Sequence, residues 1–434
     1  MKAFDSKMKI VLDVAKALED PETILTPEGI SGHAACDVLS LSHGLPGICM
    51  LYGKLMESLP YEAQYWSESG KRYLGMIVNK INQTGISDMS MYSGLSGVGL
   101  SAVCMSNGMR DYKNLIATVN RTICAWVEKA STMVDFQHGT YAVIYDVIAG
   151  MSGVLSYLSI FKSDNDCFKA LCKGIDMLIH LTEDIRIFDR LVPGWYVPAA
   201  NQFTETESRF YSKGNFNTGL SHGIAGPLAL LSQTAMDGIV RPGQTEAISK
   251  VIDFLMRYQS RFNNRAVWNS QLDFDQIVNG SVIFQQDSYR DAWCYGAPGI
   301  CYALLCAATS IDDRELSAFC IDTLRDAAKS PEGLFSPTIC HGYMGVLQLL
   351  EGAEDLLGKS CFGAEKQELM QKVLDSYDDG HKFKFKCIEY DHEVCANVAF
   401  DICGFLEGSA GIALGLCSLE HRKNNIWKKA ILVV

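Results

Sequence analysis

Two cysteines and one histidine in this 434-residue chain have the residue types of a metal site. Cys294 lies in RDAWCYG, and Cys340 and His341 are neighbours in CHGYMG. Two thiolates and one imidazole, with the fourth position open, are the ligand set of a catalytic zinc ion, and soft thiolates select zinc over magnesium or calcium. No Cys-x-x-Cys motif supports this hypothesis, so the alternative is that both cysteines are ordinary buried apolar side chains.

A glycine repeat relates these three residues to one another. The pattern Gly-x-x-Gly occurs seven times and uses 14 of the 37 glycines. Its copies are unevenly spaced, which favours a closed ring with loops of varied length over an open solenoid. The first glycines of the seven copies are Gly44, Gly94, Gly150, Gly223, Gly296, Gly342 and Gly408.

Helical patterns flank every copy of the repeat. An apolar stretch follows each copy, at 48–55, 98–105, 154–158, 228–231, 300–308, 346–350 and 412–416. A segment with apolar residues three and four apart precedes each copy, at 4–18, 73–81, 115–127, 168–179, 248–255, 316–324 and 369–377. This period is typical of amphipathic helices. We therefore predict an all-α ring of paired helices, seven apolar ones inside and seven amphipathic ones outside, forming one domain over residues 1–434.

Glycine has a physical role in such a ring. The turns that enter the inner helices crowd toward one axis, where a missing Cβ permits close backbone approach and positive φ. The N-terminal ends of the inner helices, with their unpaired N–H groups, would then face a central cavity. The only strand-like segment that we identify lies within residues 185–217, where we predict loops or a small β-containing insertion.

The residue just before the first glycine of each copy would line that cavity. These residues are His43, Ser93, Ala149, His222, Tyr295, His341 and Glu407. Reactive residue types concentrate in copies four to six. In copies five and six, Cys294 comes directly before Tyr295 and Cys340 directly before His341. The common register places the two cysteines and His341 at one level of the ring, which favours the zinc hypothesis over the buried-cysteine alternative.

Further polar residues near the same turns have types suited to catalysis. A Cys2His zinc site suits thiol alkylation better than hydrolysis, because thiolate ligands leave a bound substrate thiolate more nucleophilic. His222 has the side chain of a general acid or base. Arg290 could stabilise an oxyanion or enolate, or form a structural ion pair. Asp146 could act in catalysis or cap a helix, and for His43 we favour a structural role.

Composition narrows the class of protein. The formal net charge is −12 and no basic run occurs, which argues against a nucleic-acid groove and mildly favours a cationic substrate. The first twenty residues carry charges throughout and do not resemble a signal peptide. We expect a cytoplasmic protein with reduced thiols. Two stretches without Asp, Glu, Lys or Arg, 215–236 and 292–311, contain Gly and Pro and are interpreted as buried interior rather than membrane spans.

The motifs YDVIAGMSG, NTGLSHGIAG, RDAWCYGAPG, CHGYMG and FLEGSAG resemble those of the LanC-type lanthionine synthetases. The likeness is greatest to the stand-alone class I cyclases of nisin- and subtilin-like peptides, and it extends from the first helix to Leu416. It implies an α/α toroid of seven inner and seven outer helices with a small β-containing extension.

The resemblance also implies a set of roles. Zinc would be held by Cys294, Cys340 and His341, and the acid/base residue would be His222, with Asp146, Arg290 and Tyr295 as further active-site groups. The reaction would be intramolecular Michael addition of Cys thiolates to dehydroalanine or dehydrobutyrine in a precursor peptide. Dehydration would come from a partner enzyme, in an assembly with an exporter that could associate with the membrane.

Three alternatives remain at this stage. The same site would serve addition of glutathione to dehydroamino acids in proteins. A zinc prenyltransferase-like toroid also activates a substrate thiol, but its Asp, Cys and His ligands differ from the paired Cys294 and Cys340. A non-catalytic helical-repeat module that binds peptides would need zinc only for structure.

Overall fold

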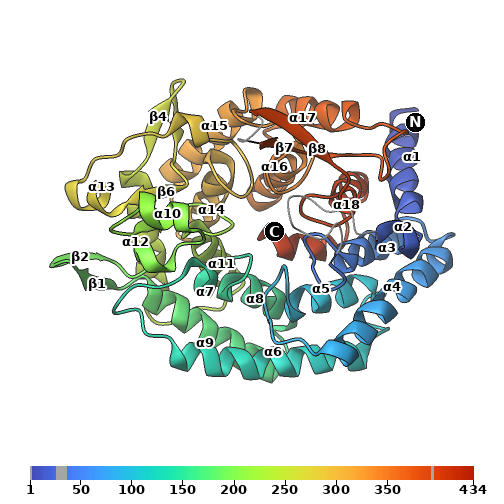
Figure 1. Ribbon diagram of the computed structural model, residues 1–434, viewed down its shortest axis with the longest axis horizontal. Helices are drawn as coiled ribbons and strands as arrows, with labels where there is room; N and C mark the ends of the chain where they lie inside the picture. Colours follow the sequence, from blue (N-terminus) through green and yellow to red (C-terminus); the bar gives the residue numbers. More distant parts are fainter. Residues whose placement is uncertain (1, 26–36, 392–394) are drawn as a thin grey trace. The chain divides into compact units, whose positions relative to one another are not determined.

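The computed structural model describes residues 2–25, 37–391 and 395–434 (Figure 1). They fall into two compact units. The first unit contains Met1–Asn120, Leu334–Gln348 and Lys366–Ile431, and the second contains Arg121–Gly333, Leu349–Glu365 and Leu432–Val434. This division does not test the prediction of one domain over residues 1–434, which stays a prediction.

The first unit contains most of the elements from the two ends of the chain. They are α1 (Lys2–Ala17), α2 (Pro21–Ile24), α3 (Leu45–Ser58), α4 (Ala63–Thr84), α5 (Leu95–Met105), β7 (Cys387–Asp391), β8 (Ala396–Phe400), α18 (Ser409–Glu420) and η4 (Ile426–Ile431). Three helices have residues in both units, namely α6 (Lys113–Met133), α16 (Tyr343–Leu357) and α17 (Gly363–Asp375).

The second unit contains the central elements. Its helices are α7 (Ala142–Tyr145), α8 (Met151–Leu158), η1 (Ser159–Phe161), α9 (Asn165–Leu181), η2 (Ala199–Asn201), α10 (Glu205–Phe210), α11 (Ala225–Met236), α12 (Gln244–Arg257), α13 (Phe274–Asn279), η3 (Gln286–Ser288), α14 (Ala297–Ser310) and α15 (Arg314–Lys329). Its strands are β1 (Asp184–Ile187), β2 (Arg190–Pro193), β3 (Asn215–Asn217), β4 (Ser260–Phe262), β5 (Arg265–Val267) and β6 (Gln271–Asp273).

Helices occupy all of the positions that the two hydrophobic patterns predict. The apolar stretches lie in α3, α5, α8, α11, α14, α16 and α18, and the amphipathic segments lie in α1, α4, α6, α9, α12, α15 and α17. Only the first and last segments run past their helices, because α1 ends at Ala17, one residue before Leu18, and α17 ends at Asp375, before Tyr377. Burial follows the patterns too: in α14 every residue from Ala297 to Ala308 is buried, whereas α15 buries only one face.

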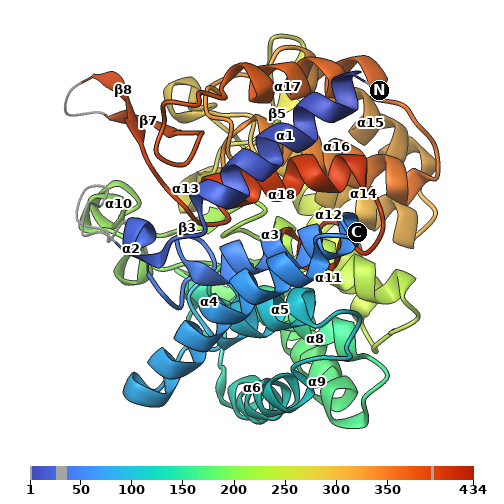
Figure 2. The ribbon, with the colours of Figure 1, turned by 90° about the vertical axis from the view of Figure 1, so that its right-hand side faces the viewer.

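Four of the apolar helices pack against the amphipathic helix that follows each of them in the chain, whereas α5 packs against the preceding helix, α4. The four pairs are α3 with α4, α8 with α9, α11 with α12 and α14 with α15. In the first unit the last apolar helix, α18, packs against the first amphipathic helix, α1 (Figure 2). An ion pair of 2.6 Å between Lys7 Nζ and Glu420 Oε1 reinforces that contact.

The glycine turns have no room for side chains. A Cβ on Gly44 would overlap the carbonyl oxygen of Asp37, and a Cβ on Gly296 would overlap that of Arg290. The predicted close backbone approach is therefore confirmed. The prediction of positive φ is wrong for six of the seven first glycines, since only Gly296, with φ of 92°, has it. Gly44, Gly94, Gly150 and Gly408 are extended, with φ of −133° at Gly44. These glycines are therefore required by the lack of space for a Cβ and not by a positive φ.

Hydrogen bonds between backbones join neighbouring turns within each unit. Each acceptor is the carbonyl of the residue two positions before the first glycine of one copy. The N–H donor belongs to the turn of the preceding copy. In the first unit the bonds are Leu41 N to Tyr92 O, Leu406 N to Ser42 O and Cys340 N to Leu406 O, and in the second they are Val147 N to Ser221 O and Leu220 N to Cys294 O, all between 2.8 and 3.1 Å. The copies therefore share one structural register.

Short two-stranded sheets lie outside the helical repeat. Antiparallel pairs join β1 to β2, β3 to β6, β4 to β5, and β7 to β8. The first of them and β3 lie in the 185–217 region where we predicted β structure, although β3 pairs with a strand outside it. Part of that region is helical instead, because Thr204 and Glu207 form a capping box that begins α10.

The two charge-poor stretches, 215–236 and 292–311, are almost entirely buried within the second unit, as predicted. Among the described residues we find no helix with both the length and the apolar character needed to cross a membrane.

Replacing Gly44 by alanine tests the spatial role of the turns. The new Cβ would force the backbones apart, and we expect the free energy of unfolding to fall by about 1–3 kcal/mol. Gly75→Ala is the control, because Gly75 lies within α4 with open space around it and should become about 0.5–1 kcal/mol more stable. Urea unfolding measures both, and equal stability of the two variants would contradict the spatial role.

Candidate functional site

His222 and Asp146 form a close pair in the second unit. The distance from His222 Nδ1 to Asp146 Oδ2 is 2.6 Å. The side chain of Asp146 is fully buried, whereas that of His222 is 28% exposed. Because an ionised carboxylate only accepts hydrogen bonds, His222 Nδ1 carries the proton. The structure thus joins two of the residues that the sequence singled out, and it orients the imidazole as in an acid/base pair.

The other carboxylate oxygen of Asp146 binds the turn that begins α8. Oδ1 accepts hydrogen bonds from Ala149 N at 2.8 Å and Gly150 N at 2.6 Å. The capping alternative for Asp146 is wrong, because Gly150 is the N-cap of α8. The carboxylate instead holds the turn that leads into the helix, which is compatible with its pairing to His222. One buried side chain fixes both the turn of copy three and the histidine of copy four.

Aromatic side chains surround His222. Its ring lies 5.0 Å from that of Phe203 and 6.4 Å from that of Tyr295, between centroids. The Tyr295 hydroxyl accepts a hydrogen bond from Asn217 Nδ2 at 3.1 Å. Burial raises the pKa of the Tyr295 phenol above its ordinary value, so it stays protonated at neutral pH and can donate a hydrogen bond.

Arg290 belongs to a loop that a buried network fixes. Arg265 forms a buried ion pair with Asp291, and Asp291 also accepts hydrogen bonds from the Tyr289 hydroxyl at 2.5 Å and from Glu332 N at 2.8 Å. Arg290 is not part of this ion pair and is partly exposed. The buried ion pair is therefore formed by Arg265 and not by Arg290. Its partner Asp291 is next to Arg290 and fixes the loop that carries it.

Cys294 and Cys340 occupy equivalent positions in their turns. The Cys294 carbonyl accepts from Leu220 N at 3.0 Å and from Ser221 N at 3.2 Å in the second unit. In the first unit Cys340 N donates to Leu406 O at 2.9 Å. Each cysteine lies two residues before the first glycine of its copy. The predicted placement of the two thiols at one level of the ring stays a prediction.

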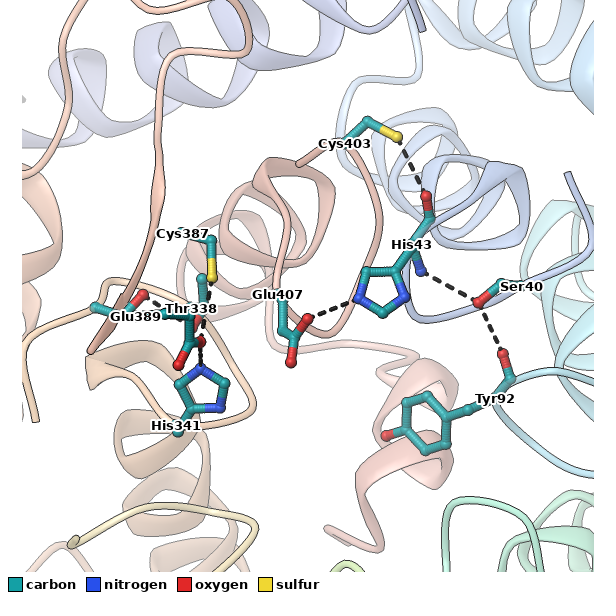
Figure 3. A network of polar contacts seen from close by, with 10 residues as sticks. Ser40, His43, Tyr92, Thr338, His341, Cys387, Glu389, Cys403 and Glu407 are labelled. Atoms are coloured by element: carbon teal, nitrogen blue, oxygen red, sulfur yellow. Dashed lines mark hydrogen bonds and ion pairs between the residues drawn. The ribbon is translucent and has the colours of Figure 1, made fainter. Parts of the chain in front are cut away.

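A group of Cys, His and Glu side chains able to hold a metal ion is present around His341 (Figure 3). Within the first unit, the ligand atoms of His341, Cys387 and Glu389 lie within 4.8 Å of one another. His341 Nε2 contacts Glu389 Oε1, and Cys387 Sγ lies 3.6 Å from the same oxygen. Burial raises the pKa of the Cys387 thiol to about 11. A nearly buried imidazole held by a carboxylate is the usual setting of a metal-binding histidine, so these residues fit a zinc ion.

His43 pairs with Glu407 in the same unit. The distance from His43 Nε2 to Glu407 Oε2 is 2.7 Å, and Figure 3 shows the carboxylate pointing toward the imidazole. The two residues directly precede the first glycines of copies one and seven, so the contact joins equivalent positions of two copies. This contact agrees with the structural role that we favoured for His43.

Sequence reasoning missed several of these groups. Cys387 and Glu389 come from a hairpin outside the repeat, and nothing in their local sequence marks them. Asn217 and Phe203 were likewise unmarked, although Asn217 precedes His222 in the motif NTGLSHG. The repeat pointed to Glu407 as the residue before a first glycine, but the sequence did not reveal its contact with His43.

Comparison with known proteins gives a consistent result. Residues 37–432 match the family model described as lanthionine synthetase C-like protein. The nisin biosynthesis protein NisC of Lactococcus lactis subsp. lactis is 29% identical over 400 residues, which are 91% of this chain and 89% of that protein.

A solved structure of nisin cyclase is also similar. It superimposes with a TM-score of 0.80 and 26% identity, covering 99% of this chain and 96% of the other. With the helices at every expected position, this likeness confirms the predicted fold class, the all-α α/α toroid.

Two substitutions of Asp146 separate its role in the turn from its charge. Asp146→Ala removes the acceptor for two backbone N–H groups, and we expect a loss of about 1–3 kcal/mol in the free energy of unfolding. Asp146→Asn keeps an acceptor oxygen and should lose clearly less. Urea unfolding of both variants provides the measurement, and equal losses would show that the side-chain oxygen does not hold the turn.

Proposed function

The chain belongs to the lanthionine synthetase C-like family, and from this premise we propose that it is a lanthionine cyclase that closes thioether rings in lantibiotic biosynthesis. The observation that carries the proposal is the similarity to nisin cyclase along nearly the whole chain. The His222–Asp146 pair and the Cys and His side chains of the glycine turns supply groups suited to that chemistry.

The proposed reaction is an intramolecular Michael addition. A cysteine thiolate of the precursor peptide attacks the β-carbon of dehydroalanine or dehydrobutyrine, and a carbon–sulfur bond forms. The π electrons of the carbon–carbon double bond move to the carbonyl oxygen as an enolate. A proton then returns to the α-carbon, which gives lanthionine or methyllanthionine with no net loss of atoms.

His222 is proposed as the group that moves this proton. Asp146 holds the Nδ1–H at 2.6 Å, which leaves Nε2 to exchange a proton with the substrate. The carboxylate fixes the orientation of the imidazole while Nε2 accepts the thiol proton and then delivers a proton to the α-carbon. Histidine suits this task because it gains and loses a proton near neutral pH.

Tyr295 and Arg290 are proposed to stabilise the enolate. The Tyr295 phenol stays protonated because burial raises its pKa, so it can donate a hydrogen bond to a developing oxyanion. Arg290 brings a cation on a loop that the Arg265–Asp291 pair fixes. Fixed donors and charges lower the energy of an enolate more than mobile water does.

Cys294, Cys340 and His341 are proposed as the zinc ligands. Support comes from the equivalent positions of the two cysteines, each two residues before the first glycine of its copy, and from the burial of His341. When bound, zinc would lower the pKa of the substrate thiol and keep it as a nucleophile. The ligands' own task is to present two thiolates and an imidazole while leaving one position open.

The proposed partners follow from this reaction. The substrate is a dehydrated precursor peptide with leader and core, so a separate dehydratase must act first. We propose that the cyclase works with this dehydratase and with a peptide exporter. The net charge of −12 is compatible with a cationic peptide substrate.

Metal analysis tests the proposed ligand set. We expect a single zinc ion per chain in the purified protein, and Cys294→Ala, Cys340→Ala or His341→Ala should lose most of it together with cyclisation of a dehydrated, leader-bearing precursor. Cys301→Ala is the matched control, because Cys301 is a buried cysteine of α14 only seven residues from Cys294. If Cys294→Ala keeps both its metal and its cyclase activity, the zinc assignment is wrong.

His222→Asn tests the proton transfer. Loss of a general acid or base typically slows a reaction about 10²–10⁴-fold, so thiol consumption should slow by that factor while zinc content stays unchanged. In deuterated water the label at the α-carbon should lose its stereochemical uniformity. The control is His180→Asn, since His180 is a partly exposed residue of α9. Normal rate and labelling in His222→Asn would refute the role.

A further inference from the structure

We propose that Glu389 of β7 is the carboxylate partner of the metal-binding imidazole, a positioning residue that determines which nitrogen of His341 faces the zinc. Cys387 supports this carboxylate and does not bind the metal. The inference rests on the zinc site of the proposed function, and it concerns two residues of the β7–β8 hairpin to which neither the repeat nor that proposal assigns a role.

The first observation is the contact itself. Glu389 Oε1 meets His341 Nε2, and Cys387 Sγ lies 3.6 Å from the same carboxylate oxygen (Figure 3). All three side chains belong to the first unit. Cys387 is 2% exposed, so the carboxylate is held on one side by a buried thiol and on the other by the imidazole.

The second observation is that β7 is fixed to the turn carrying His341. Ile388 N donates to Ser336 Oγ at 3.2 Å, and this hydroxyl lies 3.2 Å from Thr338 Oγ1. The Ser336 carbonyl in turn accepts from Tyr343 N at 2.9 Å, in the first turn of α16. The bond from Ile388, the residue before Glu389, therefore fixes the strand to this turn and sets the distance of Glu389 from His341.

These contacts give Glu389 a definite chemical effect. A carboxylate only accepts hydrogen bonds, so it keeps a proton on His341 Nε2 and assigns Nδ1 to the metal. Such a contact also fixes the plane of the ring and increases the basicity of the ligating nitrogen. Removing the carboxylate partner of a metal-bound histidine typically weakens metal binding about 10–100-fold.

Direct ligation by Cys387 and Glu389 is the competing interpretation. The two side chains and His341 are close enough to surround one ion. Positioning is favoured because Glu389 already engages Nε2 and Cys387 is directed at the carboxylate oxygen. A metal at Nε2 would have to displace both contacts.

Zinc affinity, measured by competition with a chromogenic chelator, tests the proposal. We expect Glu389→Ala to bind zinc about 10–100-fold more weakly than the unaltered protein. Glu389→Gln keeps an acceptor oxygen, so its zinc affinity should lie between those of Glu389→Ala and the unaltered protein. The control is Tyr390→Phe, the next residue of β7, whose side chain points to the other face of the strand and should leave the affinity unchanged.

Cobalt substitution separates positioning from ligation. Thiolate-to-cobalt charge-transfer absorption reports the number of cysteine ligands, and Cys387→Ala should leave its intensity unchanged. A loss of intensity in that variant, or an unaltered zinc affinity in Glu389→Ala, would overturn the inference while the zinc site of the proposed function stands. If the unaltered protein binds no zinc, or if Cys294→Ala and Cys340→Ala bind it normally, the proposed function fails as well. Circular dichroism of each variant checks that the helices are intact.

Discussion

Close backbone contact between neighbouring glycine turns is the constraint on which the rest of the structure depends. A Cβ on Gly44 would overlap the carbonyl oxygen of Asp37 in the same turn, so glycine keeps each turn compact, and the compact turns bond to one another through backbone N–H and carbonyl groups. This contact sets a common register within each unit. In the second unit the accepting carbonyls are those of Ser221 and Cys294, so His222 and Tyr295 follow the same backbone bond.

Most of the helical fold could be predicted from the sequence because two independent signals agree. A period of three and four marks the helices that bury one face, such as α15, and uniform apolarity marks those that are buried all round, such as α14. Glycine marks the start of each apolar helix. The same register identified His222 and Asp146 as candidates, and their contact at 2.6 Å follows from the adjacency of copies three and four.

The remaining groups of the site could not be predicted, for a physical reason. Glu389 and Cys387 reach His341 from a hairpin nearly fifty residues further along the chain, and a two-stranded hairpin leaves no periodic signature strong enough to locate it. Asn217 contacts Tyr295 through a pairing of β3 with β6 that local sequence does not reveal. Lack of space for a Cβ and positive φ both favour glycine, so the sequence alone could not tell which applies. Among the seven first glycines of the repeat, only Gly296 shows both.

The packing of α1 against α18 has a consequence for the order of folding during synthesis. Lys7 and Glu420 are 413 residues apart and form an ion pair, and Tyr92 donates to the carbonyl of Ala430 at 2.9 Å. Because the chain is synthesised at about 5–20 residues per second, α1 is complete roughly 20–80 s before its partner helix, α18. Its apolar face is exposed to the cellular environment during that interval, whereas helices such as α14 and α15 meet as soon as both have left the ribosome. The first unit is thus the part of the protein that most needs protection by chaperones while the chain is unfinished.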